Sequence, residues 1–248
     1  MTTAAPFPAR IASREDWLAA RTALLARERA LTHELDTLRA ERRQLPWVKV
    51  DTAYVFDGPQ GPCTLADLFR GRSQLAVYHF MLAPDSEHIC PGCSLIADHI
   101  DAARQHFEQA DLAFAAISRA PLARIEEVRR RLGWSFPWVS SGGNSFNYDF
   151  GVSFTKDDIA AGRAIYNYGT PIQNSEDMHG TSIFARDDSG QVFHTYSTYH
   201  RGDELMIGAF NWLDLAPKGR NETEGTMSWV KLHDEYETND ADASGCCG

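Results

Sequence analysis

The first part of the chain has the apolar pattern of one long helix. Residues 13–45 carry an apolar side chain at every seventh position and charged side chains on the other faces. The seventh-position residues are Trp17, Leu24, Leu31 and Leu38. Ser13 followed by Asp16 resembles a capping box, and Pro46 marks the end of the helix. The stripe allows two arrangements: packing of the helix on its own domain, or contact with a second copy of the chain.

After Pro46 the pattern changes to short apolar runs separated by turns. The run at 73–82 is continuously apolar, which is typical of a central strand buried on both faces. In chain order, the predicted elements are a strand at 48–56, a strand at 73–82, a helix at 94–110, a strand at 111–118, a helix at 121–134, a hairpin of 181–187 and 191–199, and a helix at 203–215. Residues 135–180, rich in glycine, serine, asparagine and aromatic residues, form an insert before the hairpin.

From residue 73 onward this order is β-α-β-α-insert-β-β-α. A β-α-β unit requires a parallel strand pair with a right-handed crossover, and the hairpin adds antiparallel strands. The pattern therefore predicts an α/β protein with a thioredoxin-like mixed sheet flanked by helices. We predict three parts: an N-terminal helical extension (1–46), the thioredoxin-like domain (47–236) and a disordered acidic tail (237–248).

Composition and charge narrow the function classes. The net charge of −10 offers no basic stripe for phosphates, so we expect no nucleic-acid partner. No run of eighteen apolar residues is present, which argues against a membrane span. The first ten residues lack the basic and apolar regions of a secretory signal, so we expect a cytoplasmic protein.

The cysteines supply the candidate chemistry. They are Cys63, Cys90, Cys93, Cys246 and Cys247, and their odd number argues against a framework of structural disulfides. The sequence Cys90-Pro91-Gly92-Cys93 stands at the start of the predicted 94–110 helix, where free amides and the helix dipole stabilise a thiolate. We predict that Cys90 is the nucleophile and Cys93 the resolving thiol of a redox pair. Metal binding and inert thiols are the alternatives, and the role of Cys246 and Cys247 stays open.

Histidines near the pair define the metal alternative. Cys90, Cys93, His88 and His179 have the donor types of a zinc or copper site with two sulfur and two nitrogen ligands. Structural, hydrogen-bonded histidines are the simpler interpretation. His88 is the histidine best placed to favour the Cys90 thiolate, because an imidazolium two residues away would lower the pKa of the thiol.

The insert supplies candidate substrate-binding residues. Its aromatic side chains could wall a pocket over the cysteine pair, or they could form a second core layer. They include Trp138, Phe146, Tyr148 and Phe150, and Trp134 directly before the insert is a further candidate. Arg119 directly follows the second core strand, so it lies at the carboxyl end of the sheet, where open α/β sheets place their sites.

The chain resembles the family called domain of unknown function 899, thioredoxin-like proteins described as predicted dithiol-disulfide oxidoreductases. The matching stretches include the Cys-Pro-Gly-Cys loop, ISRAPLARIEEVRRRLGWSFPWVSS and GQVFHTYSTYHRGDE, within residues 48–216. The resemblance implies a thioredoxin-like fold with Cys90 and Cys93 as the redox pair. Thioredoxins place a cis-proline facing this pair, whereas here Thr181 occupies that place and becomes a candidate substrate contact. Typical peroxiredoxins have Thr or Ser three residues before the reactive cysteine, where this chain has Glu87.

The sequence thus predicts a thiol-disulfide oxidoreductase that acts on an unidentified thiol or disulfide substrate. It needs no cofactor beyond the redox-active disulfide, and a homodimer is expected from the 13–45 helix. The alternatives are a metal-binding thioredoxin-fold protein, a peroxidase-like thiol enzyme and a structural or interaction role.

Overall fold

A computed structural model of the protein describes residues 10–172 and 174–237. Its core is an eight-stranded sheet with the order β1-β10-β9-β4-β5-β6-β2-β3. The sheet strands are β1 (Val48–Lys49), β2 (Val55–Gly58), β3 (Gly61–Thr64), β4 (Gln74–His79), β5 (Leu112–Ser118), β6 (Trp138–Ser140), β9 (Gly180–Arg186) and β10 (Val192–Tyr199). A separate hairpin consists of β7 (Ile165–Tyr166) and β8 (Thr170–Pro171).

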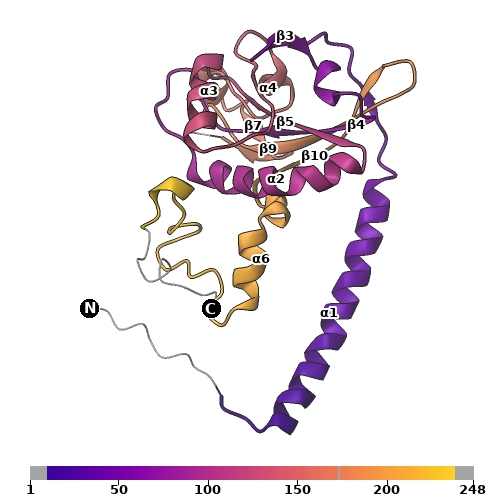
Figure 1. Cartoon of the computed structure of the whole chain (residues 1–248), viewed down its shortest axis with the longest axis vertical. Coiled ribbons are helices and arrows are strands. Elements are labelled where there is room, and N and C mark those ends of the chain that lie inside the picture. The colour runs from indigo at the N-terminus through magenta and orange to yellow at the C-terminus, as the bar shows by residue number, and fades with distance from the viewer. Residues whose placement is uncertain (1–9, 173, 238–248) are drawn as a thin grey trace, which may run out of the picture.

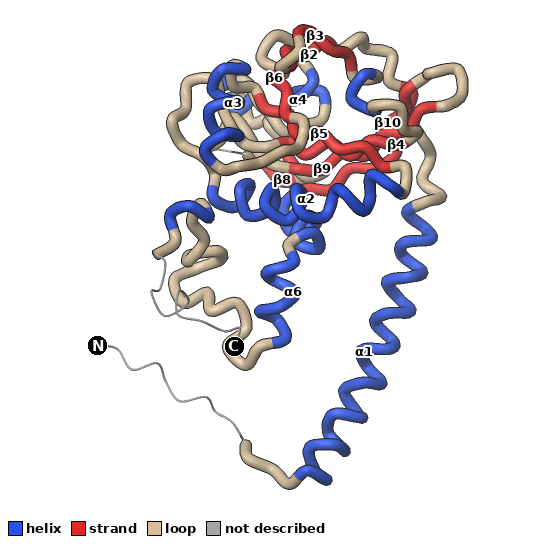
Figure 2. The backbone as a smooth tube through the Cα atoms, in the orientation of Figure 1, coloured by secondary structure: helices blue, strands red, loops and turns tan. Residues whose placement is uncertain are grey.

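Helices cover both faces of this sheet (Figures 1 and 2). The helices of the described residues are α1 (Arg14–Arg42), α2 (Pro91–Gln109), α3 (Leu122–Arg131), α4 (Phe146–Asp149), α5 (Lys156–Ala160) and α6 (Gly208–Leu215), with 3-10 segments η1 (Asp67–Phe69), η2 (His200–Met206) and η3 (His233–Glu235), and α1 does not lie on the sheet. Because side chains alternate along β4, Ala76 and Tyr78 join a core with α2, α3 and α6, whereas Leu75 and Val77 join a core with η1 and α4.

The strand pairing confirms the predicted thioredoxin-like sheet. β4 and β5 are parallel and flank the crossover helix α2, and β5 is parallel to β6. β9 runs antiparallel to β4 on its other side, and β10 pairs antiparallel with β9 as the predicted hairpin. This arrangement brings the carboxyl end of β4 and the start of α2 to the same edge as the start of β9.

Three predictions of local structure were wrong. The single strand predicted at 48–56 is two strands: β1 is one edge of the sheet, and β2 lies next to the opposite edge. The insert contains a sheet strand, β6, whose Trp138 pairs with Ala116 of β5. The helix predicted at 203–215 is the 3-10 segment η2 followed by α6.

Helix α1 extends away from the sheet and its covering helices (Figure 1). Ser13 caps it by accepting the Asp16 N–H, as the sequence predicts, and no residue of the helix is buried. Trp17 at one end of the apolar stripe is 50% exposed and Leu38 at the other end is 48% exposed. Of the two arrangements predicted for the stripe, the structure therefore does not show packing on the chain's own domain.

No helix in the described ranges is long and apolar enough to cross a bilayer. The predicted tail from residue 238 onward, with Cys246 and Cys247, lies outside the described residues.

Candidate active site at the start of helix α2

The cysteine pair sits where the chain passes from the end of β4 into α2. Cys90 is the N-cap of the helix, with extended backbone, and Pro91 occupies the first helical position, where its fixed φ suits a helix start. The loop before it is fixed to the sheet, since Phe80 accepts a hydrogen bond from the Ser118 hydroxyl and Leu82 accepts one from the Ala120 N–H. Both cysteines are free thiols.

The surroundings of Cys90 favour its thiolate. The Cys93 thiol, which faces the Cys90 sulfur, is the largest cause of a pKa lowered to about 6. The backbone amides of Cys93 and Gly92 act in the same direction, and the Cys93 N–H lies 3.4 Å from the Cys90 sulfur. His88 adds a smaller favourable charge, while partial burial opposes the shift. Cys90 therefore combines a stabilised thiolate with partial exposure, as a nucleophile requires.

The surroundings of Cys93 favour its protonated thiol instead. It is 1% exposed, and desolvation raises its pKa well above the ordinary range. The pairing with Cys90 raises it further, whereas Tyr78 and the Met81 backbone partly offset this. The two thiols therefore differ strongly: one is accessible and acidic, and the other is buried and protonated at neutral pH.

Two cavities reach the pair. The first, which we call the Arg119 cavity, has a volume of about 810 Å³ and is lined by Cys90, His88, Arg119 and Asp177 among others. The second, the Met227 cavity, has a volume of about 490 Å³ and is lined by both cysteines and by Met227 of the C-terminal segment, although Cys93 itself stays buried. A Cβ placed on Gly92 would lie 3.3 Å from the Met227 methyl carbon, so this methionine rests directly on the Cys-Pro-Gly-Cys turn.

Arg119 lies in the first of these cavities, as its position after β5 suggested. Its guanidinium donates to both carboxylate oxygens of Asp177, at 2.7 and 2.8 Å, and also to the Tyr148 hydroxyl. The side chains of Arg119 and Asp177 are 11% and 10% exposed. The charge of Arg119 is thus largely neutralised inside the protein.

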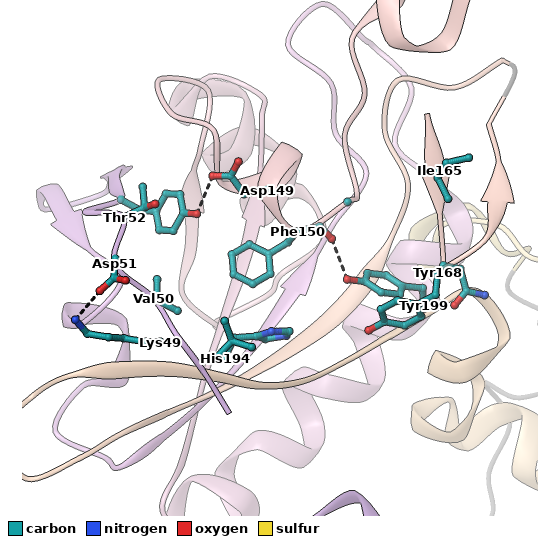
Figure 3. Close-up of a pocket in the computed structure, with 14 residues that line it drawn as sticks. Lys49, Val50, Asp51, Thr52, Asp149, Phe150, Ile165, Tyr168, His194 and Tyr199 are labelled. Atoms are coloured by element: carbon teal, nitrogen blue, oxygen red, sulfur yellow. Dashed lines mark hydrogen bonds and ion pairs between the residues drawn. The ribbon is translucent and has the colours of Figure 1, made fainter. Parts of the chain in front are cut away.

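The structure does not place Trp138 or Phe150 at the cysteines. Trp138 is fully buried in the core between Phe80 and Trp134, donates to the Ser118 hydroxyl, and lines neither cavity at the pair. The core-layer interpretation of the insert therefore holds for Trp138. Phe150 instead lines a separate cavity of about 440 Å³ with Tyr199, His194 and Asp149, and none of Cys63, Cys90 and Cys93 lines it (Figure 3).

Thr181 is buried in the sheet and lines neither cavity at the pair. It pairs in register with Tyr78 across β9 and β4 and is 6% exposed, so it is not open to a substrate. Beside it is Asp203 of η2, a fully buried acid that the sequence analysis missed. Nothing in the surrounding HRGDELM sequence indicates that this particular carboxyl faces inward.

The four residues of the predicted metal site do not form a common site. His179 lines the Met227 cavity with both cysteines, whereas His88 lines the Arg119 cavity. Within residues 10–172 and 174–237, no three His, Cys, Asp or Glu side chains are grouped so that they could hold a metal ion.

The sheet order and the helix that begins at a cysteine pair define a thioredoxin-like protein with a dithiol at the carboxyl edge of its sheet. The chain belongs to the family described as bacterial protein of unknown function (DUF899), whose family model matches residues 6–236, and the resemblance noted from the sequence is confirmed.

Solved structures with a similar chain path include peroxiredoxin Q of Xanthomonas campestris, which is 16% identical with a TM-score of 0.47 and with 70% of this chain and 99% of that chain covered. They also include the peroxidoxin BcpB of Mycobacterium tuberculosis, at 17% identity and a TM-score of 0.41, with coverages of 67% and 98%. No curated protein matches the chain.

Proposed function

We propose that the protein is a thiol-disulfide oxidoreductase in which Cys90 and Cys93 alternate between dithiol and disulfide. The observation that carries the proposal is the asymmetry of the pair: an accessible thiol with a lowered pKa caps α2 and faces a buried, protonated thiol one turn into the helix. Such asymmetry separates the attacking thiol from the resolving thiol.

The reaction follows from this division. The Cys90 thiolate attacks one sulfur of a substrate disulfide, forms a mixed disulfide and releases the first substrate thiolate. Cys93 then loses its proton and attacks the Cys90 sulfur, which releases the second substrate thiolate. The substrate gains two electrons, the protein retains a Cys90–Cys93 disulfide, and a thiol reductant restores the dithiol.

Two further features support a small or flexible substrate. Cys90 opens into the Arg119 cavity, which is lined by the loop before α2, by α5 and by the segment around Asp177. On the other side, Met227 covers the turn between the cysteines. A rigid protein surface would have to displace one of these segments to reach the sulfur.

A peroxidase that uses the same thiolate is the second candidate. Arg119 lines the cavity at Cys90 and could stabilise a leaving oxyanion. Its bidentate ion pair with Asp177 already uses that charge, which favours disulfide over peroxide as the substrate.

Single-turnover reaction with a small aromatic disulfide tests the proposal. The chain with Cys63, Cys246 and Cys247 changed to serine should release two substrate thiolates per molecule, and the additional change Cys93→Ser should leave one release and a stable mixed disulfide. Cys90→Ser should abolish both. Equal release from the Cys90→Ser variant would refute the proposal, and faster reaction with a hydroperoxide than with any disulfide would favour the peroxidase.

A further inference from the structure

Asp203 is a buried acid without a visible structural task. It is 0% exposed, and within the described part of the chain neither of its carboxylate oxygens has a hydrogen-bond partner. Burying an unpaired carboxylate is unfavourable, and native structures keep few such groups. The group therefore calls for an explanation outside packing.

Other unpartnered polar groups surround this acid. The Thr181 and Tyr78 hydroxyls are buried, and neither has a hydrogen-bond partner among the described residues. They are neighbours, because Tyr78 of β4 and Thr181 of β9 stand opposite each other in the sheet. Cys93 and Asp203 both raise the pKa of Tyr78, and the Thr181 hydroxyl lowers the pKa of the Asp203 carboxyl. Tyr78, Thr181 and Asp203 thus belong to one cluster of buried polar groups, and Tyr78 is its member next to the resolving thiol.

His179 lies between this cluster and solvent. Its Nε2 lies 3.8 Å from an Asp203 carboxylate oxygen and 3.4 Å from the His200 carbonyl oxygen, and its side chain is 25% exposed. It also lines the Met227 cavity together with Cys90 and Cys93. The remaining titratable groups facing Asp203 are Tyr166 and Tyr199, whose hydroxyls donate to backbone carbonyls of His179 and Phe150 and are therefore occupied.

We propose that Asp203 accepts the Cys93 proton when the mixed disulfide is resolved, with the Tyr78 and Thr181 hydroxyls between them and His179 as the exit. This rests on the proposed function. The Cys93 S–H bond breaks as its sulfur bonds to the Cys90 sulfur, and the bond from Cys90 to the substrate sulfur breaks. The substrate leaves as a thiolate with the electron pair, the proton is held by Asp203, and it then leaves for solvent by way of His179.

The protonation states agree with this role. Burial raises the pKa of Cys93, so the thiol needs a base in order to attack. Burial also raises the pKa of Asp203 to about 7, so the carboxyl can both accept and return a proton near neutral pH. Asp203 is a positioning and proton-holding group in this scheme, because the substrate touches only Cys90.

The test uses the two releases of the aromatic disulfide in the full-length chain with Cys63, Cys246 and Cys247 changed to serine. The first release reports attack by Cys90, and the second reports resolution by Cys93. Asp203→Asn should leave the first release within about twofold of the parent and slow the second by about 100-fold at pH 7, within the usual range for a lost general base. The deficit should shrink as the pH rises, because solvent hydroxide then removes the Cys93 proton directly.

Glu108→Gln is the matched control, since it removes a mostly buried carboxylate at the far end of α2, where Glu108 pairs with Arg72 and Arg104. It should keep both releases. Tyr78→Phe provides a second test that does not alter the acid and should also slow only the second release. A second release at the parent rate, with the parent pH profile, in both Asp203→Asn and Tyr78→Phe would overturn the inference. Absence of a Cys90-dependent first release in the parent would instead refute the proposed function.

Discussion

Replacing Cys93 by alanine should weaken the acidity of Cys90 and leave the helix start in place. The Cys93 thiol is the largest cause of the lowered pKa of Cys90, ahead of the backbone amides and His88. A hydrogen bond to a charged group contributes about 1.5–3 kcal/mol, which corresponds to about 1–2 pKa units. From a starting value of about 6, we therefore expect a pKa of about 7–8 for Cys90 in Cys93→Ala.

The choice of pH decides whether this difference is visible. At pH 7, a thiol of pKa about 6 has about 30 times more thiolate than a reference thiol of pKa about 8.5. A more acidic thiolate is also a weaker nucleophile, and the usual dependence removes about 10- to 20-fold of that advantage. Cys90 should therefore react only about 2- to 3-fold faster than the reference thiol at pH 7 but about 10- to 25-fold faster at pH 5.5, where the reference thiol is almost fully protonated.

Alkylation by iodoacetamide between pH 5 and 9, followed by peptide-resolved mass spectrometry, measures each cysteine in the same sample. Cys63 is the internal reference, because partial burial and the nearby Asp67 and Asp57 raise its pKa. Wild-type Cys90 should react faster than Cys63 by the largest ratio at the acidic end of the range. In Cys93→Ala, the Cys90 profile should move to higher pH by about 1–2 units. Parallel profiles for Cys90 and Cys63 in the wild type would refute the reasoning about the helix start.

Three other predictions concern stability and assembly. The Asp203 pKa is raised in the folded state from 3.8 to about 7, so its stabilising contribution is present at acidic pH and is lost as the pH rises through 7. In urea unfolding, the free energy of unfolding of Asp203→Asn relative to the wild type should therefore rise by about 2–3 kcal/mol between pH 5 and pH 8. A difference that stays constant with pH would contradict this. Arg119→Ala leaves the Asp177 carboxylate unpaired and should lower the free energy of unfolding by about 3–5 kcal/mol, part of which the added change Asp177→Asn should restore. The exposed stripe of α1 should pair with the same stripe of a second copy in antiparallel orientation, so that the acidic first turn of one helix meets the basic last turn of the other. Light scattering should give twice 27.7 kDa for the full chain. A mass of 27.7 kDa at tens of micromolar would rule out the dimer.

The central part of the fold could be predicted because its patterns are local and strong. The continuous apolar run of β4, the capping of α1 and the alternation of strand and helix each depend on residues close in sequence. The 48–56 strand was wrong because alternation predicts an extended chain but not its partners. Pairing with β10 at one edge and β3 at the other divides the segment.

The site was predictable in its chemistry and not in its surroundings. The placement of Cys90 and Cys93 at a helix start follows from four consecutive residues and the element before them. By contrast, the burial of Trp138 and the contact of Met227 with Gly92 depend on how distant segments pack. Asp203 illustrates the limit: an acid in a polar stretch has the pattern of a surface residue, and only the tertiary fold buries it close to Thr181 and His179.

The redox equilibrium of the cysteine pair tests the central claim most directly. The full-length protein, equilibrated in thiol-disulfide buffers of stepped potential, is trapped with acid and analysed by mass spectrometry. We predict a two-electron transition between the Cys90–Cys93 dithiol and disulfide, with a midpoint inside the range of about −120 to −320 mV covered by known thioredoxin-fold proteins and cellular thiol pools. If Cys90 and Cys93 remain reduced across that range, or link to other cysteines instead of to each other, the protein does not function as a dithiol oxidoreductase.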